Sequence, residues 1–390
     1  MNFQTKTDKA SDVDWKTLIA IAFPFFVNGV VFAAWATNIP HVQSTFELTK
    51  GEIGSLLLVV ALGAVVFMSI TAVVTQTRSA HLLCAISTFA FPCALIFTMG
   101  TGHVAGLICA AICLGAANGS MDVTMNHLGT QMEARLNRPI MSRLHGCFSI
   151  GALVGALTTY VAIELGFPPV QQAICMTMGI GLALIFLYPV LPRTNTTQSA
   201  AAKTPSTPFV KNRKLVLLAV MSFLTMLSEG AIADWTAVYL IEYKQISTAS
   251  AALAFGTYAA LMIVGRLSGD WAVTWIGQPR LIAISGALSM IGIAFVLHNT
   301  STALHFLGFG LLGFGIANLI SVIFRAASKL SGVSPSFGIA FVSVAGYSGF
   351  LVGPALMGWV SQWIGLDRAL LVVLFSGFAM FCAAPSFSRK

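Results

Sequence analysis

Long stretches without a charged side chain dominate the chain, and short polar segments separate them. A helix that crosses a membrane needs about 20 mostly apolar residues, so most of these stretches can hold one such helix. The charge-free stretches are 17–46, 53–77, 79–121, 144–163, 165–192, 215–228, 245–265, 281–324, 330–366 and 369–388.

Three of these stretches need closer reading. Two of them, 79–121 and 281–324, are long enough for two helices, and polar patches at 100–103 and 298–301 break each near its middle. The shortest stretch continues its apolar pattern past two acidic residues, so that it covers 215–240. The pattern therefore predicts twelve transmembrane helices in an all-α membrane protein.

Composition excludes the other classes of protein. Apolar residues make up 57% of the chain and charged residues only 9%, whereas a typical soluble domain has about 25% charged residues. The same numbers exclude a disordered chain, a collagen, a coiled coil and a secreted disulfide scaffold. Strands of an outer-membrane barrel would alternate apolar and polar residues, and segments such as Leu56–Ile70 do not alternate.

The distribution of lysine and arginine predicts the orientation. If the N-terminus is inside, 18 of the 21 bases, Arg266 among them, fall in cytoplasmic segments, and only Lys50, Lys244 and Arg368 fall outside. Cytoplasmic loops carry this excess in membrane proteins, so we expect both termini in the cytoplasm. The net charge of +8 is then a topology signal, and no nucleic-acid partner is expected.

The longest polar segment, 193–214, is rich in Thr, Ser, Ala and Pro and lies between the sixth and seventh predicted helices. It is typical of a flexible linker and is expected on the cytoplasmic side. We therefore predict an N-terminal six-helix bundle at 1–192 and a C-terminal one at 215–390.

The two predicted bundles share a glycine pattern. Gly151 and Gly155 recur as Gly349 and Gly353, at an offset of 349 − 151 = 198 residues. Each pair puts two small residues on one helix face, where a neighbouring helix can approach closely. Parallel six-helix repeats are typical of secondary transporters, whose substrate site lies between the halves.

Ionisable and amide side chains inside predicted helices are the first candidates for function, because burying them in a membrane is costly. Asn118, Asp122 and Asn126 are spaced four residues apart and form one polar stripe on a helix. Glu229 lies about 22 Å along a helix that begins near Lys214, close to the middle of the bilayer.

Two interpretations of these acids stay open. A carboxylate held away from water can take up and release protons near neutral pH, which suits proton-coupled transport. The alternative is a structural carboxylate that is hydrogen-bonded to a neighbouring helix. We favour the functional interpretation for Glu229, and the two are evenly matched for Asp122. Asp234 lies nearer the outer interface, where we expect a solvated helix cap.

Aromatic and polar residues complete the set of candidates. Trp35 and Trp235 could stack on a sugar ring, or they could belong to the aromatic belts at the membrane interfaces. His145 is expected to make a hydrogen bond at the end of a loop, with a proton relay as the alternative. The other candidates for contact with a solute are Asn28, Tyr258, Asn318 and Tyr347.

Motifs of enzymes and ATP-driven pumps were not found in the sequence. It contains no Gly-x4-Gly-Lys-Ser/Thr, no HExxH and no Gly-x-Ser-x-Gly, so we expect neither enzymatic activity nor a cofactor. All seven cysteines lie in apolar segments, and we expect no disulfide and no metal site.

The six-plus-six arrangement around a basic central loop resembles the major facilitator superfamily over essentially the whole chain. The segment 265–280 is similar to the cytoplasmic loop motif of that superfamily, here between helices 8 and 9. The resemblance implies a gating role for Arg266 and Asp270, and His145 is counted with them. The equivalent segment 75–80, between helices 2 and 3, lacks the glycine and the aspartate.

Five further stretches resemble the fucose-permease-like branch of bacterial inner-membrane permeases. They are Phe25–Pro40, Asp122–Asn126, Met141–Ser149, Glu229–Trp235 and Gly346–Pro354. Fucose permease has an acid in helix 1 where this chain has Asn28, so proton coupling would use Asp122 or Glu229. The resemblance implies an inner-membrane protein and a sugar or polyol as the solute.

We therefore predict a proton-coupled secondary transporter that imports a small polar solute by alternating access and works as a monomer in the lipid bilayer. The alternative is an exporter of drugs or amphipathic metabolites by proton antiport, in which an acid recognises cations. A receptor without transport activity is disfavoured, because the chain has no sizeable soluble domain for signalling.

Overall fold

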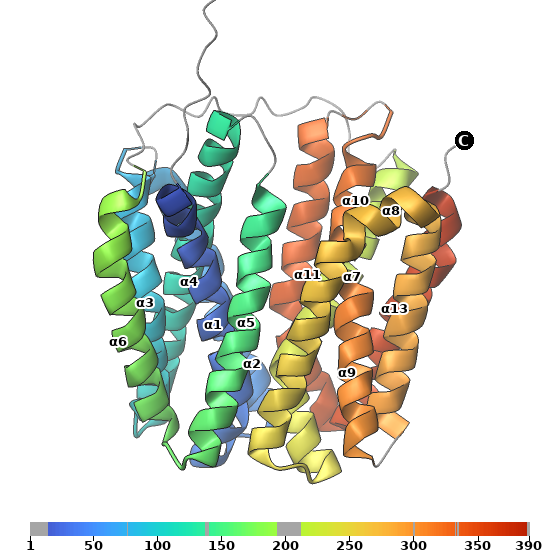
Figure 1. The fold of residues 1–390 in the computed structure, drawn as a ribbon. Helices are drawn as coiled ribbons and strands as arrows, with labels where there is room; N and C mark the ends of the chain where they lie inside the picture. Colours follow the sequence, from blue (N-terminus) through green and yellow to red (C-terminus); the bar gives the residue numbers. More distant parts are fainter. Residues whose placement is uncertain are drawn as a thin grey trace, which may run out of the picture.

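The computed structural model describes residues 15–75, 77–136, 140–192, 212–298, 301–331, 333 and 335–387. Its secondary structure is helical throughout these ranges, and the helices stand side by side as a bundle (Figure 1). The long helices are α1 (Trp15–Thr45), α2 (Lys50–Val74), α3 (Ala80–Gly100), α4 (Val104–Leu136), α5 (Met141–Glu164), α6 (Pro169–Leu187), α7 (Arg213–Lys244), α8 (Thr248–His298), α9 (Thr302–Ile316) and α11 (Pro335–Ile364). The shorter ones are η1 (Tyr188–Val190), α10 (Leu319–Ala327), α12 (Leu366–Ala369), α13 (Leu371–Ala383) and η3 (Ala384–Phe387).

Twelve segments of the described ranges are long and apolar enough to cross a membrane. The element α8 contains two of them, Thr248–Gly269 and Trp271–His298, and its helical backbone is broken at Gly277 (φ 78°). Conversely, α9 and α10 together form the single span Thr302–Ala327. The predicted breaks at 100–103 and 298–301 are confirmed, since α3 ends at Gly100 and α8 ends at His298. The predicted all-α fold with twelve membrane spans is thus confirmed.

Local chemistry sets two helix starts that matter below. Thr49 and Glu52 form a reciprocal capping box at the start of α2, which satisfies backbone N–H groups that have no partner within the helix. Asn212 caps α7 by accepting from the backbone N–H groups of Lys214 and Leu215. Consequently α7 begins at Arg213, two residues before the expected start of the second bundle at 215, and 193–211 lie outside the described residues.

The helix boundaries repeat along the chain. The starts of α2 and α8 are 248 − 50 = 198 residues apart. Glycine packing repeats as well. A side chain at Gly151 would collide with the backbone carbonyl of Phe26, and one at Gly349 would collide with that of Phe223. Close approach of α5 to α1, and of α11 to α7, therefore depends on these glycines.

The two groups of helices, α1–α6 and α7–α13, lie side by side in Figure 1. They meet chiefly where α5 packs on α8 and α2 packs on α11, and α1 also contacts α7. Buried apolar side chains from both groups form one continuous core. Any polar side chain on the facing surfaces of these helices therefore lies between the two groups.

Candidate functional site

Arg266 occupies a position that the sequence did not predict. We expected it in a cytoplasmic loop, but α8 stays helical past this residue and its backbone breaks only at Gly277. Arg266 therefore lies inside the membrane span Thr248–Gly269. The prediction of a loop residue was wrong, because the motif that suggested it begins within the helix.

The Arg266 side chain joins the two groups of helices. Its Nη1 donates to Ser149 Oγ on α5 at 2.5 Å, and its Nη2 lies 3.5 Å from Glu229 Oε1 on α7. The Glu229 side chain is only 13% exposed, and the residue lies near the middle of α7. An ion pair at this depth compensates part of the cost of withdrawing both charges from water.

A second polar cluster belongs to α1 and α4. Asn28 is buried, and its Nδ2 donates to Asn118 Oδ1 at 2.9 Å. One helical turn beyond Asn118, Asp122 Oδ1 accepts from Asn126 Nδ2 at 3.1 Å. The structure therefore brings four of the predicted candidates together as two hydrogen-bonded pairs.

Two tyrosine candidates belong to the second group of helices. Tyr258 of α8 is buried, and its hydroxyl makes no hydrogen bond to a described residue. Tyr347 of α11 is 46% exposed.

The arrangement offers hydrogen-bond donors and acceptors around one pair of opposite charges. Amides, phenols and a guanidinium suit a solute that carries several hydroxyl groups, since each can bond to a hydroxyl oxygen or proton. Farther along the same helices, Phe32 of α1 and Phe350 of α11 meet across the halves with ring centroids 6.0 Å apart. These rings bound the polar region on the side away from the start of α1.

Two predicted candidates are buried tryptophans. The indole of Trp35 lies in the apolar core, and that of Trp235 is fully buried and donates from Nε1 to Pro354 O at 2.9 Å. The belt interpretation was therefore wrong for both, because their side chains point into the bundle and not toward its outer surface. This hydrogen bond of Trp235 connects α7 to α11.

Two further polar candidates are buried. Asp234 was expected as a solvated cap, but its side chain is buried and its Oδ1 makes no hydrogen bond to a described residue. That expectation was wrong, because α7 continues ten residues beyond Asp234 to Lys244. Asn318 is buried too, and its Nδ2 donates to Gly265 O at 2.7 Å, which ties the start of α10 to α8.

His145 and Asp270 are the remaining gating candidates. His145 lies on α5 one helical turn before Ser149, the residue that accepts from Arg266, and its ring packs edge-on against Phe25 with ring centroids 5.3 Å apart. The backbone of Asp270 is helical, but its side chain lies outside the described residues. Their predicted gating roles stay predictions.

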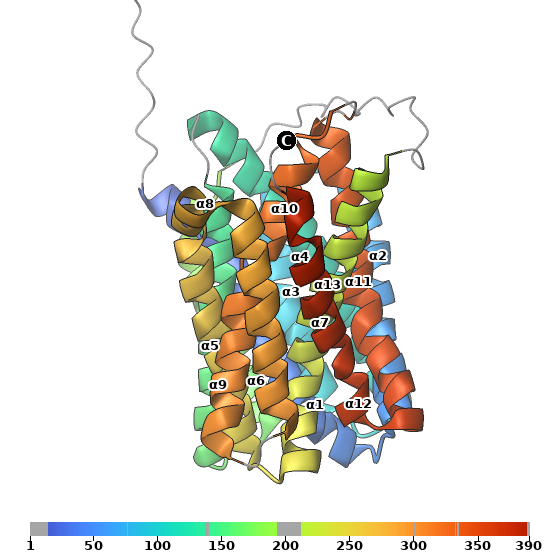
Figure 2. The same ribbon diagram turned by 90° about the vertical axis from the view of Figure 1, so that its right-hand side faces the viewer.

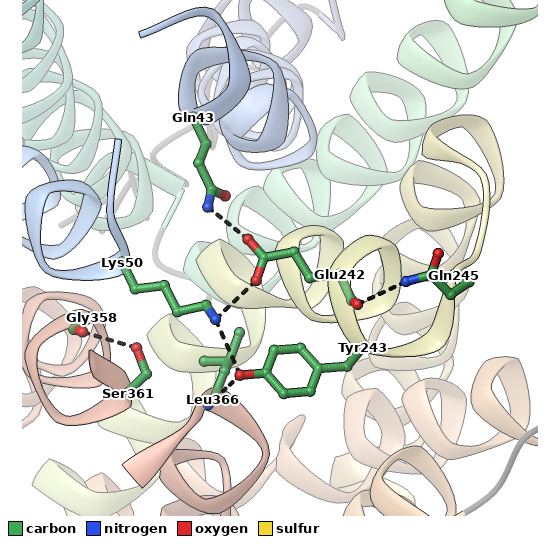
Figure 3. A network of polar contacts seen from close by, with 8 residues as sticks. All are labelled: Gln43, Lys50, Glu242, Tyr243, Gln245, Gly358, Ser361 and Leu366. Atoms are coloured by element: carbon green, nitrogen blue, oxygen red, sulfur yellow. Dashed lines mark hydrogen bonds and ion pairs between the residues drawn. The ribbon is translucent and has the colours of Figure 1, made fainter. Parts of the chain in front are cut away.

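Sequence reasoning missed a network that joins the halves at the end of the bundle where α1 and α7 end (Figure 3). Glu242 accepts from Gln43 Nε2 at 2.6 Å and pairs with Lys50 Nζ at 2.9 Å. Lys50 also donates to the Tyr243 hydroxyl at 3.1 Å and lies over its ring. The Tyr243 hydroxyl in turn accepts from the backbone N–H of Leu366 at 3.0 Å.

Contacts between α2 and α11 reinforce this end. Trp359 Nε1 donates to Ser55 Oγ at 3.0 Å, and Gln362 Nε2 donates to Thr49 Oγ1 at 3.2 Å. Gly54 and Gly358 let the two backbones touch, since a side chain at either position would collide with the opposite helix. The bundle is thus closed between the halves at this end.

One signal could have pointed to this network. Lys50 is one of only three bases that the sequence places on the outer side, and Glu242 lies near another of them. A base on the side of the membrane that otherwise has few bases indicates that it forms an ion pair with an acid. The identity of its partner depends on tertiary packing and could not be predicted from spacing.

Metal ligands do not gather in the part of the chain that the structure describes. No group of three or more His, Cys, Asp or Glu side chains in these ranges could hold a metal ion.

Comparison with known proteins decides the family. Residues 21–334 match the description of the Major Facilitator Superfamily. The chain belongs to this superfamily. Its twelve spans and the polar region between two halves are therefore those of a major facilitator transporter, a class of membrane proteins that move small solutes.

Relatives within the superfamily cover nearly the whole chain. Membrane protein MosC of Rhizobium meliloti is 39% identical over 96% of this chain and 90% of its own length. An uncharacterized MFS-type transporter of Yersinia pestis is 30% identical over 95% of this chain and 96% of its own length. These matches do not confirm the predicted assignment to the fucose-permease-like branch.

Solved structures show the same fold. A mutant of the nucleoside transporter NupG superposes with a TM-score of 0.77 at 14% identity, covering 95% of this chain and 99% of its own. A bacterial homologue of the human lysosomal transporter Spinster, in an inward-facing and unoccupied conformation, gives 0.69 at 13% identity over 95% and 97%. At these identities the likeness concerns the major facilitator fold alone.

Proposed function

We propose that the protein is a proton-coupled secondary transporter that moves a small polyhydroxy solute, a sugar or polyol, across the inner membrane by alternating access. The single observation that carries this proposal is the position of Arg266. It contacts Ser149 in one half and Glu229 in the other, so one side chain links the charge state of Glu229 to the contact between the halves.

Coupling to protons follows from this link. When Glu229 takes up a proton it loses its attraction for Arg266, and the guanidinium is free to turn toward a solute or toward Ser149 alone. Release of the proton restores the ion pair. An equilibrium between two conformations shifts only through interactions that differ between them. Making and breaking the Glu229–Arg266 ion pair would supply such a difference between the loaded and the empty carrier.

The proposed solute class rests on the groups around the pair. The amide pair of Asn28 and Asn118, the Tyr258 hydroxyl and the exposed Tyr347 can each bond to hydroxyl groups. A solute hydroxyl that reaches Tyr258 would also satisfy a polar group that is otherwise buried without a partner among the described residues. Such groups carry a desolvation cost that a matching ligand removes.

We also propose that the end of the bundle where α1 begins faces the cytoplasm, because lysine and arginine are concentrated there. The network around Glu242 would then close the periplasmic side. A reporter fused after Lys390 should be active only in the cytoplasm, and a periplasmic signal would reverse the proposed orientation.

A thermal-shift screen of the purified protein tests the solute class. Sorbitol, myo-inositol and simple hexoses would be compared with the amphipathic cation tetraphenylphosphonium, since a ligand that binds the folded state stabilises it. We expect at least one polyhydroxy solute to raise the unfolding temperature and to be accumulated by proteoliposomes under a pH gradient. Stabilisation by the cation alone would instead favour the exporter.

A further inference from the structure

A cavity of about 720 Å³ lies within the second group of helices, away from the polar region between the halves. The first turns of α7, the bend of α8 at Gly277, the end of α10 and the residues of η3 line it. In Figure 2 these segments lie at the upper end of the molecule, where α1 also begins. The proposed transport function does not use this cavity.

The lining combines bases with apolar side chains. Lys214, Arg325 and Lys329 contribute three positive charges, and no acidic residue is among the described residues that line the cavity. Leu217, Val273 and other apolar side chains form the rest of the wall. A cavity of this composition suits a ligand with an anionic group and an adjoining apolar part.

Two exposed tryptophans place the cavity at the level of lipid headgroups. Trp271 and Trp275 flank Val273 of the lining along α8, and they are 63% and 72% exposed. Their rings pack together with centroids 5.6 Å apart. Tryptophan is enriched where the hydrocarbon of a bilayer meets its headgroups. The three bases of the cavity therefore lie at about the same depth in the bilayer as the lipid phosphates.

The repeat shows that the fold itself does not require two of the bases. At the offset of 198 residues, Arg325 of α10 and Lys329, two residues beyond its end, correspond to His127 and Gln131 of α4. Those two side chains hydrogen-bond to each other at 2.8 Å. Lys214 corresponds to Lys16, so the first half keeps one base at this place and lacks the other two, whose charge calls for another explanation.

We propose that this cavity binds the phosphate headgroup of an anionic phospholipid from the adjoining leaflet. Lysine and arginine side chains between membrane helices on the cytoplasmic side attract such headgroups. The apolar part of the wall holds the glycerol and the first methylenes of the lipid. A soluble phosphate compound shares the anionic group but lacks this apolar part.

Native mass spectrometry and thermal unfolding of the full-length protein test the proposal. Phosphatidylglycerol and phosphatidylcholine are the lipid probes, and the variant is the double substitution Lys214→Gln with Lys329→Gln. The matched control is Arg213→Gln with Arg280→Gln, which removes the same charge from residues next to the lining. A Lys214→Arg, Lys329→Arg variant keeps the charge and serves if the Gln variant does not fold.

We expect phosphatidylglycerol to bind the wild type and the Arg variant about tenfold more tightly than the Gln variant, with the control near the wild type. Phosphatidylcholine should not distinguish the four proteins. Equal affinity of phosphatidylglycerol for the wild type and the Gln variant, or an equal loss in the control, would overturn the proposal. A stabilisation that inorganic phosphate alone reproduces would also overturn it, in favour of a soluble phosphate ligand.

Discussion

At the scale of single residues, the unusual feature is an arginine that reaches both halves from within a membrane span. Arginine keeps its charge in proteins and presents several donors in a rigid fork, so it can hold two partners in fixed directions. Arg266 uses this property toward Ser149 and Glu229. A lysine has a single charged nitrogen and cannot reproduce both directions.

The substitution Arg266→Lys should therefore reduce transport at least about tenfold, with little change in the amount of folded protein, because charge is kept while geometry is lost. Uptake by proteoliposomes of matched protein content measures the effect. Arg280→Lys, an exposed arginine on the same element, is the control and should behave as the wild type. Normal uptake by the Arg266 variant would show that its two contacts are incidental.

The same scale marks the limit of sequence reasoning. Helix spans follow from where charges are absent, which is why the breaks after Gly100 and His298 could be placed. The direction of a side chain depends on how helices rotate against one another, and spacing alone does not report it. Trp35 and Asp234 were misplaced for this reason, although the acid and amide candidates near Glu229 were found.

At the scale of elements, close helix contact rests on glycines at repeated positions. Gly151 on α5 touches the backbone of α1 at Phe26, and Gly349 on α11 touches that of α7 at Phe223. The sequence predicted that Gly151 with Gly155, and Gly349 with Gly353, face a neighbouring helix, because small residues four apart share a helix face. It could not predict the contact of Gly54 with Gly358, which joins α2 to α11 across the halves.

Gly151→Ala should destabilise the protein by roughly 1–3 kcal/mol, because the added methyl group collides with backbone that cannot move aside. Gly146→Ala, on the same helix, is the matched control, since a side chain there meets no atom within 4 Å. Thermal unfolding in detergent compares the two. Equal unfolding temperatures would mean that α5 and α1 tolerate a wider separation.

At the scale of the whole molecule, the contacts between the halves are uneven. Side chains around Glu242 and the first turn of α2 join the halves at one end, and Arg266 joins Ser149 to Glu229 near the middle of α7. A carrier that alternates must break the closed end to release or admit its solute. The Lys50–Glu242 pair is partly exposed, and such pairs contribute about 0–1 kcal/mol each, so the closure is easily reversed.

Lys50→Glu should therefore open this end, because it sets two acids against each other at Glu242. Spin labels on α2 and α11 near Thr49 and Gln362 should report a longer distance, and adding Glu242→Lys should restore the shorter one. Arg368→Glu, an exposed base in the adjoining α12, is the control. An unchanged distance in the Lys50 variant would show that the ion pair does not hold the halves together.

The substitution Glu229→Gln tests the central claim most directly, because it keeps the shape of the side chain and removes its titration. In proteoliposomes, the variant should lose accumulation of a polyol driven by a pH gradient and retain counterflow, since exchange of solute need not move protons. Glu164→Gln, at the exposed end of α5, should keep both activities. Accumulation by the Glu229 variant at the level of the wild type would contradict the account.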